Sequence, residues 1–451
     1  MADIKPPRGS RDLRKNRSTE KDAAPKLSNF AVFGDSVWAL VLSSLLLLVA
    51  VATSLWIDHS AAGDGDGIVD LYTQLGPVPV IDPPQIFDIL QQDAITDEIL
   101  SAYKKDGVVA VRGLIEPEVM DRLDAEANVF LEEQRRKNDG HKRPGTQFHT
   151  VHHNAIFRHP PDNTTISPWV EVTLRSRVPQ FAAELLGMRQ LDSNQTMRML
   201  RDIFLAKDDD QYTCGWHVDD FGFWPATAES PGVNAWVALD DMPVDQGGGF
   251  ALAIASHQAP WREEAHYVTG ASTTFPAQGY TSADDMIANR PGKGTCNLKY
   301  SAPHLHERME ETKRIYPVKR GDVIFHERWL FHRTVPFDRA FVAEHQNEDV
   351  IYRRYSIRYG PGSSVIPPGY GTELSVLSDE RNGGRTADEV TRFDGPWYPQ
   401  AWPSASDNEL RDLRQLVENR VPTADLRRTT LKKEMKPLLK RLARKQNKPL
   451  I

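Results

Sequence analysis

The motif His217-Val218-Asp219 constrains the fold more than any other short stretch of this sequence. It lies in a segment, residues 216–219, whose pattern predicts a short strand. Side chains alternate between the two faces of a strand, so His217 and Asp219 should point to the same side. An imidazole and a carboxylate placed in this way are two of the three ligands of a 2-His-1-carboxylate iron site. Such a tripeptide recurs by chance, so the prediction depends on a third ligand downstream.

Short strand patterns separated by turn residues dominate the chain after about Met197, whereas the preceding part is mainly helical in pattern. A buried strand is expected at 107–112, between a helical pattern at 99–106 and an amphipathic helix at 117–136. This order predicts a mainly β fold with flanking helices and a double-stranded β-helix core, the jelly-roll or cupin-like type. Further strands are expected at 203–206, 216–219, 234–239, 250–254, 323–325 and 351–359, and the polar stretch 258–319 is expected to be a mostly irregular lid or insertion.

Residues 37–57 form an apolar stretch that contains no charged side chain. As a helix it is long enough to cross the roughly 30 Å hydrocarbon core of a bilayer. The segment before it, 1–36, contains eight Lys and Arg, and the segment after it, 58–77, contains none. The positive-inside rule therefore predicts a type II signal-anchor, with the body in the lumen of the secretory pathway (ER or Golgi) or at the cell surface. Two glycosylation sequons, which begin at Asn163 and Asn194, agree with this side.

These patterns divide the chain into five expected regions. They are a disordered basic cytoplasmic tail (1–36), a transmembrane signal-anchor helix (37–57), a stalk (58–85), a folded domain (86–405) and a basic helical C-terminal extension (406–451). The last residues, 430–451, combine leucines with a basic face, which is typical either of a solvated terminal helix or of one that contacts an anionic membrane surface.

The charge of the folded body excludes one broad class of partner. The whole chain has a formal net charge of −7, but both ends are basic, so residues 58–423 carry a net charge of about −18. An acidic body argues against nucleic-acid binding. Cys214 and Cys296 are too few for a disulfide framework, and the sequence leaves open whether they form one bridge.

The segment 321–332 supplies the third ligand of the expected metal site. It reads GDVIFHERWLFH, which predicts a turn, a strand into the core and a histidine, His332, at its end. His326 in the same segment is the competing candidate. Two histidines and one carboxylate bind one face of an octahedral ion and leave three positions open.

Six stretches in this order resemble the phytanoyl-CoA dioxygenase family of iron- and 2-oxoglutarate-dependent oxygenases. The resemblance covers roughly residues 85–403. The matching stretches are KKDGVVAVRGLIEPE (104–118), WHVDDFGFWP (216–225), NAWVALDDM (234–242), GGGFALAIASH (247–257), GDVIFHERWLFH (321–332) and RRYSIRY (353–359).

The resemblance implies that His217, Asp219 and His332 bind iron(II). His326 matches a position that is often polar or histidine in the family without being a ligand. Halogenating relatives carry a small residue at the position of Asp219, so the intact carboxylate favours hydroxylation or another oxidation. Trp236 matches an aromatic residue near the co-substrate, although an ordinary core tryptophan would fit the same position.

The distal carboxylate of 2-oxoglutarate needs a cation that can bind it through two hydrogen bonds, which arginine provides. In the last expected strand, Arg354 shares a face with Ser356, and Arg354-Tyr355-Ser356 has the R-x-S form of related oxygenases, in which the hydroxyl adds a hydrogen bond. Arg354 is the first candidate, Arg353 the second and Arg339 the third. The interval from His332 to Arg354 is longer than is usual in the family.

The resemblance implies a dioxygenase that hydroxylates a C–H bond and releases succinate and carbon dioxide. Its cofactors would be Fe(2+), 2-oxoglutarate and O2, with ascorbate as a further candidate. A luminal body argues against an acyl-CoA substrate, which leaves a small molecule, a lipid, or a secreted protein or glycan. Two alternatives stay open: a non-catalytic membrane-anchored binding module that retains the jelly roll, and a metal-dependent hydrolase with the same ligands.

Overall fold

The computed structural model describes the part of the chain that carries the expected strands. The described residues are 81–89, 95–137, 150–157, 166–188, 195–208, 215–219, 230–258, 303–345, 350–366 and 398–413, with a few single positions between them. The chain divides into two compact units, residues 1–71 and 72–451, and every described residue belongs to the second.

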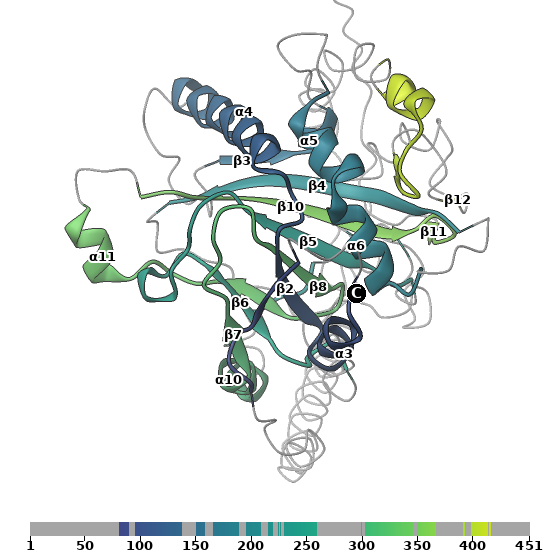
Figure 1. Ribbon diagram of the computed structural model, residues 1–451. Coiled ribbons are helices and arrows are strands. Elements are labelled where there is room, and N and C mark those ends of the chain that lie inside the picture. The colour runs from purple at the N-terminus through teal and green to yellow at the C-terminus, as the bar shows by residue number, and fades with distance from the viewer. Residues whose placement is uncertain are drawn as a thin grey trace, which may run out of the picture. The chain divides into compact units, whose positions relative to one another are not determined.

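The larger of two main sheets contains eight strands and is antiparallel except at one edge, where the first two strands run parallel (Figure 1). Its order is β1 (Ile86–Asp88), β2 (Val108–Arg112), β8 (Val323–Glu327), β5 (Val233–Ala238), β10 (Tyr352–Pro361), β4 (Met197–Lys207) and β13 (Gln400–Trp402), with β3 (Thr150–His153) paired to β4.

The smaller sheet is antiparallel and has the order β7 (Lys313–Ile315), β6 (Phe250–Ala253) and β9 (His332–Thr334). Apolar side chains of the two sheets pack together in one buried cluster, to which Trp236 and Ile324 contribute from the larger sheet and Phe250 and Leu252 from the smaller. Two packed antiparallel sheets of short strands are the core of a jelly roll, so the expected fold class is confirmed for the core. A separate pair, β11 (Val365–Ile366) and β12 (Thr391–Arg392), completes the described strands.

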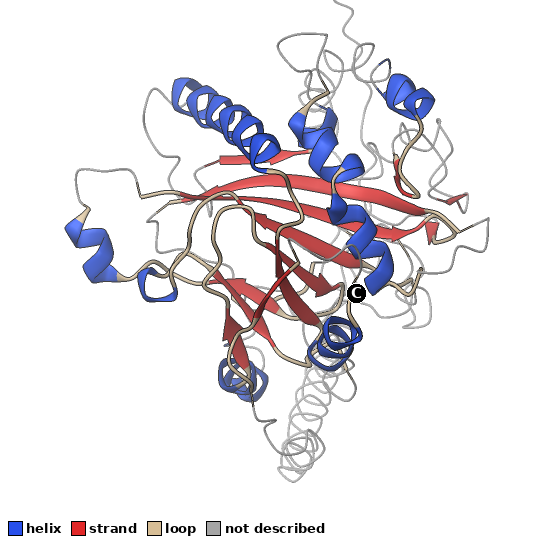
Figure 2. Cartoon of the chain, in the orientation of Figure 1, coloured by secondary structure: helices blue, strands red, loops and turns tan. Residues whose placement is uncertain are grey.

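Helices cover the face of the larger sheet that points away from the smaller one (Figure 2). The described helices are α3 (Asp97–Asp106), α4 (Pro117–Lys137), α5 (Pro168–Val170), α6 (Arg177–Leu185), α10 (Pro303–Glu311) and α11 (Arg339–Glu344), with single turns η1 (Ala155–Phe157), η2 (Glu171–Arg175) and η3 (Val244–Gln246).

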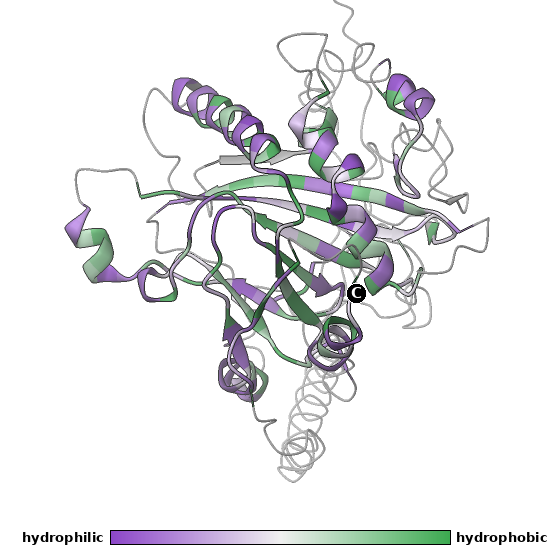
Figure 3. Ribbon diagram, in the orientation of Figure 1, coloured by the Kyte–Doolittle hydropathy of each residue, from purple (hydrophilic) through white to green (hydrophobic). Residues whose placement is uncertain are grey.

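Helix α4 follows the expected amphipathic pattern. Val119, Leu123, Ala127 and Phe130 recur at helical spacing, and all four are buried. Figure 3 shows the matching alternation of hydrophilic and hydrophobic bands along this helix. The ring centroid of Phe130 lies 5.3 Å from that of Trp169 in α5 and 5.4 Å from that of Phe204 in β4, so the helix packs on an aromatic cluster that includes the sheet.

Strand β10 sends side chains of opposite character to its two faces. Tyr355, Ile357 and Tyr359 belong to the apolar cluster beneath the helices. The alternate residues Arg354 and Arg358 are also buried, but they point between the two sheets, on the face shared with Ser356 and Tyr352. Polar side chains thus enter the interior from one face of a central strand.

The segment 321–334 differs from the sequence prediction. Instead of one strand that ends at His332, the chain forms β8 in the larger sheet, turns, and forms β9 in the smaller sheet. The turn is closed by a backbone hydrogen bond of 3.1 Å from Leu330 N–H to Glu327 C=O. His326 and His332 therefore reach the interior from opposite sheets.

The prediction of a mostly irregular stretch at 258–319 is wrong for its last part. Residues 303–319 contain helix α10 and strand β7, which extends the smaller sheet, while residues 259–298 lie outside the described residues. The expected strand at 216–219 is reduced to a single antiparallel bridge from His217 to His332.

Among the described residues, no helix combines the length and the apolar composition needed to cross a membrane. The expected anchor (37–57), the sequons at Asn163 and Asn194, both cysteines and the basic tail (430–451) lie outside the described residues.

Two glycines with the same positive φ provide a test of the packing around the C-terminal end of α3. Gly107 ends α3 with φ 78°, and a Cβ there would lie 2.4 Å from His257 Nδ1 and 2.8 Å from Leu330 Cδ1. Gly187 has φ 78° too, but nothing lies within 4 Å of its Cβ position. Gly187→Ala should cost about 1–2 kcal/mol of unfolding free energy through backbone strain alone. Gly107→Ala should cost about 2–5 kcal/mol, because overpacking is added.

Urea unfolding of the two variants measures this difference. Equal losses would contradict the prediction, since they would mean that His257 and Leu330 move aside without cost.

Candidate metal and co-substrate site

A reciprocal pair of backbone hydrogen bonds joins two histidines of the site. The N–H of His217 donates to the carbonyl of His332 at 3.1 Å, and the N–H of His332 donates to the carbonyl of His217 at 2.9 Å. Residues paired in this way on antiparallel segments point their side chains to the same face. The two imidazole centroids consequently lie 4.5 Å apart.

Both imidazoles are oriented by their own chain. Nδ1 of His217 lies 2.8 Å from the carbonyl oxygen of Gly215, and Nδ1 of His332 lies 3.0 Å from that of Leu330. A carbonyl oxygen can only accept, so each Nδ1 carries a proton and each Nε2 is the nitrogen left to face a metal ion. Burial holds the pKa of His332 well below its usual range, which keeps it neutral. Neutral imidazoles with a free Nε2 are the form that binds a metal ion.

Asp219 completes the group from the same segment as His217. Its Oδ1 lies 3.8 Å from His332 Nε2, and the ligand atoms of His217, Asp219 and His332 all lie within 4.8 Å of one another. Burial alone would raise the pKa of Asp219, but the charge of Arg358, the neighbouring His332 and His217, and the hydrogen bonds from Arg358 together outweigh it and hold the pKa well below its usual range. Its Oδ2 accepts from Arg358 Nε at 2.9 Å and from Nη2 at 2.6 Å.

His326, the competing ligand candidate, takes part in a different network. Its Nδ1 lies 3.0 Å from its neighbour's carbonyl, Glu327 C=O, which makes Nε2 the acceptor. Asn234 Nδ2 then donates to this Nε2 at 2.9 Å, and Asn234 Oδ1 accepts from Ser356 Oγ at 2.9 Å. Burial lowers the pKa of His326 to about 4. His326 lies beside His332, with centroids 4.9 Å apart, but it is not a member of the metal-ligand group.

Arg354 lies on the inner face of β10 and is 3% exposed. Its Nη2 donates to Thr334 Oγ1 at 3.0 Å, and its guanidinium carbon lies 5.9 Å from the ring centroid of Trp236. Trp236 stacks on Phe250, which in turn contacts His332 at 5.1 Å between centroids. The arginine is thus connected to the histidines through two aromatic rings. Burial lowers its pKa to about 10, which leaves it charged at neutral pH.

The other two arginine candidates lie elsewhere. Arg353 points to the opposite side of β10, as alternation along a strand requires, and forms ion pairs with Asp240 and Asp124. Arg339 is exposed at the start of α11. The structure therefore does not bring Arg353 or Arg339 to the site, and Arg354 is the arginine candidate that shares the interior with the three ligands.

Ser356 differs in detail from its expected role. The network fixed by the Glu327 carbonyl makes its hydroxyl a donor to Asn234. That proton is therefore directed away from an anion bound by Arg354. Within this network Ser356 positions Asn234 and, through it, His326.

Glu310 of helix α10 is a residue of the site that sequence reasoning did not single out. Its Oε1 accepts from Trp216 Nε1 at 2.9 Å and from Arg333 Nε at 3.0 Å. Trp216 and Arg333 each adjoin a metal-ligand candidate, so this carboxylate ties together the two segments that carry His217 and His332. Burial would raise its pKa, but hydrogen bonds from Lys313 and Arg333 lower it to about 2.

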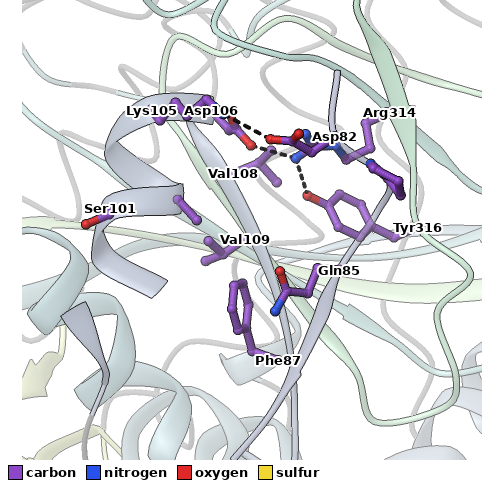
Figure 4. A pocket seen from close by; sticks show the side chains of 12 residues that line it. Asp82, Gln85, Phe87, Ser101, Lys105, Asp106, Val108, Val109, Arg314 and Tyr316 are labelled. Carbon is purple, nitrogen blue, oxygen red and sulfur yellow. Dashed lines mark hydrogen bonds and ion pairs between the residues drawn. The ribbon is translucent and has the colours of Figure 1, made fainter. Parts of the chain in front are cut away.

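A pocket of about 210 Å³ lies away from this group, between α3, β2 and the segment that leads into β1 (Figure 4). Its charged side chains bind one another: Lys105 contacts Asp82 at 3.0 Å, and Arg314 contacts Asp106 at 2.7 Å. None of its lining residues belongs to the metal-ligand group. The pocket is therefore separate from the metal-ligand group.

Comparison with known proteins agrees with this geometry. The model of the phytanoyl-CoA dioxygenase (PhyH) family matches residues 103–337, which is more than half of the chain. The chain belongs to the phytanoyl-CoA dioxygenase family. Together with the His217, Asp219 and His332 group, membership makes this PhyH protein an iron- and 2-oxoglutarate-dependent oxygenase, and thus an oxidoreductase.

Solved structures similar to this PhyH protein include the three that follow. The carbocyclase SnoK from nogalamycin biosynthesis is 17% identical, with a TM-score of 0.44, over 71% of this chain and 100% of its own. The epimerase SnoN, in complex with Fe3+, alpha ketoglutarate and nogalamycin RO, is 18% identical, with a TM-score of 0.47, over 68% and 98%. HygX from Streptomyces hygroscopicus, with nickel and 2-oxoglutarate bound, is 18% identical, with a TM-score of 0.33, over 60% and 88%. Comparison with curated proteins gives no match.

The donor set fits iron(II). Two neutral imidazoles and one carboxylate are the ligands of the facial triad in non-heme oxygenases. Nδ1 of each imidazole, the nitrogen that does not face the ion, is hydrogen-bonded to a backbone carbonyl. Such hydrogen bonds orient histidine ligands in metal sites.

Metal titration should separate the two histidine candidates. His332→Ala should weaken cobalt(II) binding by more than about 100-fold, because it removes a ligand and not merely a supporting group. His326→Gln should leave cobalt(II) affinity within about tenfold, because this residue acts through Asn234. Titration of cobalt(II) followed by its visible absorption, with far-UV circular dichroism as the folding control, measures both. The reverse pattern would make His326 the ligand.

Proposed function

We propose that the protein hydroxylates a C–H bond of a small-molecule or lipid substrate. In the proposed reaction, the substrate, 2-oxoglutarate and O2 give the hydroxylated substrate, succinate and carbon dioxide. The observation that carries this proposal is the complete group of His217, Asp219 and His332 with the cationic Arg354 on the same interior face. Bound iron(II) supplies the redox chemistry, and the protein binds and orients the reactants.

The roles of the residues follow from their contacts. His217 and His332 offer Nε2, Asp219 offers one carboxylate oxygen, and Arg354 offers a planar cation for the distal carboxylate of 2-oxoglutarate. Trp236 and Phe250 are buried and stack on each other, with Trp236 beside Arg354 and Phe250 beside His332, so apolar rings adjoin both of these residues. The intact Asp219 favours oxygen transfer over halogenation, because no ligand position is left for a halide in its place.

The membrane location is part of the same proposal. The uncharged stretch 37–57, with eight Lys and Arg in the segment before it and none in the segment 58–77 after it, supports a type II anchor with the oxygenase domain in the secretory lumen or outside the cell. A membrane anchor is compatible with a lipid among the substrate classes. The basic tail, 430–451, offers a second contact for an anionic membrane surface.

Turnover in the presence of the co-substrate tests the function. Anaerobic addition of iron(II) and 2-oxoglutarate should produce a weak charge-transfer band at about 500 nm, typical of facial-triad sites. Oxygen uptake should then be coupled to formation of succinate and carbon dioxide. Folded protein that gives neither the band nor succinate would be a binding module, and hydrolysis of a substrate without oxygen uptake would indicate a metal-dependent hydrolase.

Two neighbouring arginines test the co-substrate assignment. Arg354→Gln should raise the 2-oxoglutarate concentration needed for half-maximal succinate formation by about 10–100-fold, because a charge-assisted hydrogen bond to an anion contributes about 1.5–3 kcal/mol. Arg353→Gln is the matched control. It removes the ion pairs to Asp240 and Asp124 and should lower stability while leaving the 2-oxoglutarate requirement unchanged. An unchanged requirement in Arg354→Gln would remove Arg354 from the site.

Fractionation tests the proposed topology. The full chain should remain in the membrane pellet after carbonate extraction, whereas a fragment that starts at residue 58 should be released. In sealed microsomes the domain should resist added protease. Endoglycosidase should increase the electrophoretic mobility of the protein, and replacing Asn163 and Asn194 by Gln should abolish this change. Digestion of the domain in intact vesicles would place it on the cytoplasmic side instead.

A further inference from the structure

Arg358 binds only one oxygen of Asp219. Both hydrogen bonds that Arg358 donates to Asp219, from Nε at 2.9 Å and from Nη2 at 2.6 Å, end on Oδ2. The two side chains are 5% and 6% exposed, so water does not compete for this oxygen. Oδ1 is the oxygen that lies 3.8 Å from His332 Nε2 and thus faces the centre of the ligand group.

We propose that Arg358 is a positioning residue that restricts Asp219 to a single coordinating oxygen, Oδ1. This inference rests on the proposed metal site and deepens it. A carboxylate with two accessible oxygens can bind an ion through one or both of them. With Oδ2 held by Arg358, Asp219 supplies one ligand atom, so three positions of an octahedral ion remain for 2-oxoglutarate and dioxygen.

The sheet holds Arg358 in place from both sides. Its backbone pairs with Arg201 of β4 and with Asn234 of β5, so β10 cannot shift toward or away from the metal group without breaking two ladders. Arg354 lies four residues earlier on the same face, about 13 Å along the strand. One strand therefore carries the anchor for the co-substrate and the residue that orients the metal-binding carboxylate.

An arginine suits this role better than a lysine. Its Nε and Nη2 are fixed in one plane, so both can donate to the same oxygen and set the rotation of the carboxylate as well as its distance. A lysine ammonium could bind the same oxygen but would leave its orientation free.

Rescue by acetate tests the proposal without turnover. Asp219→Ala should weaken cobalt(II) binding by more than about 100-fold, because it removes a ligand, and should leave Arg358 facing the space of the missing carboxylate. Acetate added in the millimolar range should bind Arg358 there and restore most of the affinity. In the double variant Asp219→Ala/Arg358→Gln, acetate should restore none. Asp219→Ala/Arg354→Gln is the matched control and should be rescued, because Arg354 does not contact Asp219.

Thermal unfolding without metal provides a second readout. Acetate should raise the melting temperature of Asp219→Ala, because it binds the folded state next to a buried cation, and should not raise that of the Asp219→Ala/Arg358→Gln variant. If Asp219→Ala is unfolded in plain buffer, recovery of its far-UV signal in acetate, again only with Arg358 present, is the same test.

The outcomes separate this inference from the proposed function. Absence of cobalt(II) binding by the wild-type protein would remove the metal site itself. If the wild-type protein binds cobalt(II), two results would overturn only the role of Arg358. One is that acetate does not rescue Asp219→Ala. The other is that acetate rescues Asp219→Ala and Asp219→Ala/Arg358→Gln equally. If acetate fails to rescue Asp219→Ala/Arg354→Gln, it acts at the proposed co-substrate arginine. That result would also overturn the proposed role of Arg358.

Discussion

The reciprocal backbone hydrogen bonds between His217 and His332 are the constraint on which the site depends. They fix the two imidazoles side by side before any ion is present, and Asp219 follows two residues later on the same face. The carbonyls of Gly215 and Leu330 then orient each ring through its Nδ1. Glu310 accepts hydrogen bonds from Trp216 and Arg333 and so links the two segments that carry the histidines. Each ligand is held by backbone or by a buried charge.

The alternation of β10 lets one strand serve both the core and the chemistry. Its outer face supplies Tyr355, Ile357 and Tyr359 to the cluster under the helices, and its inner face supplies Arg354 and Arg358. Strand β10 thus buries two cations, and burial of a cation destabilises the folded state unless an anion lies beside it. Asp219 accompanies Arg358 in the structure, and 2-oxoglutarate would accompany Arg354 in the proposed complex. Burial also lowers the pKa of Arg354, which stays charged at neutral pH and can bind an anion.

Local sequence patterns predicted the features that depend on periodicity. The apolar face of α4, the buried strand β5 and the shared face of Arg354 and Ser356 follow from side-chain spacing alone, and two residues of the ligand group follow from one tripeptide. Features that depend on long-range packing were missed. No local signal shows that the chain changes sheets between His326 and His332, because the turn there contains apolar Trp329 and Leu330 and neither glycine nor proline. Glu310 is one of many glutamates, and only the folded chain brings it to Trp216 and Arg333. Arg353 is the second arginine candidate in the sequence, and its outward direction follows from alternation once the register of β10 is known.

The long interval between His332 and Arg354 shows how such a site tolerates change in chain length. Strand β9 is fixed by its pairing with β6, and β10 by its pairing with β4 and β5, so both ends of the interval are anchored independently of what connects them. The entropy cost of closing a loop grows only slowly with its length. The connection that contains α11 can therefore lengthen or shorten during evolution while both functional side chains stay where they are. The number of residues between two motifs is thus a poor measure of their separation in this fold, because strand register sets where both side chains lie.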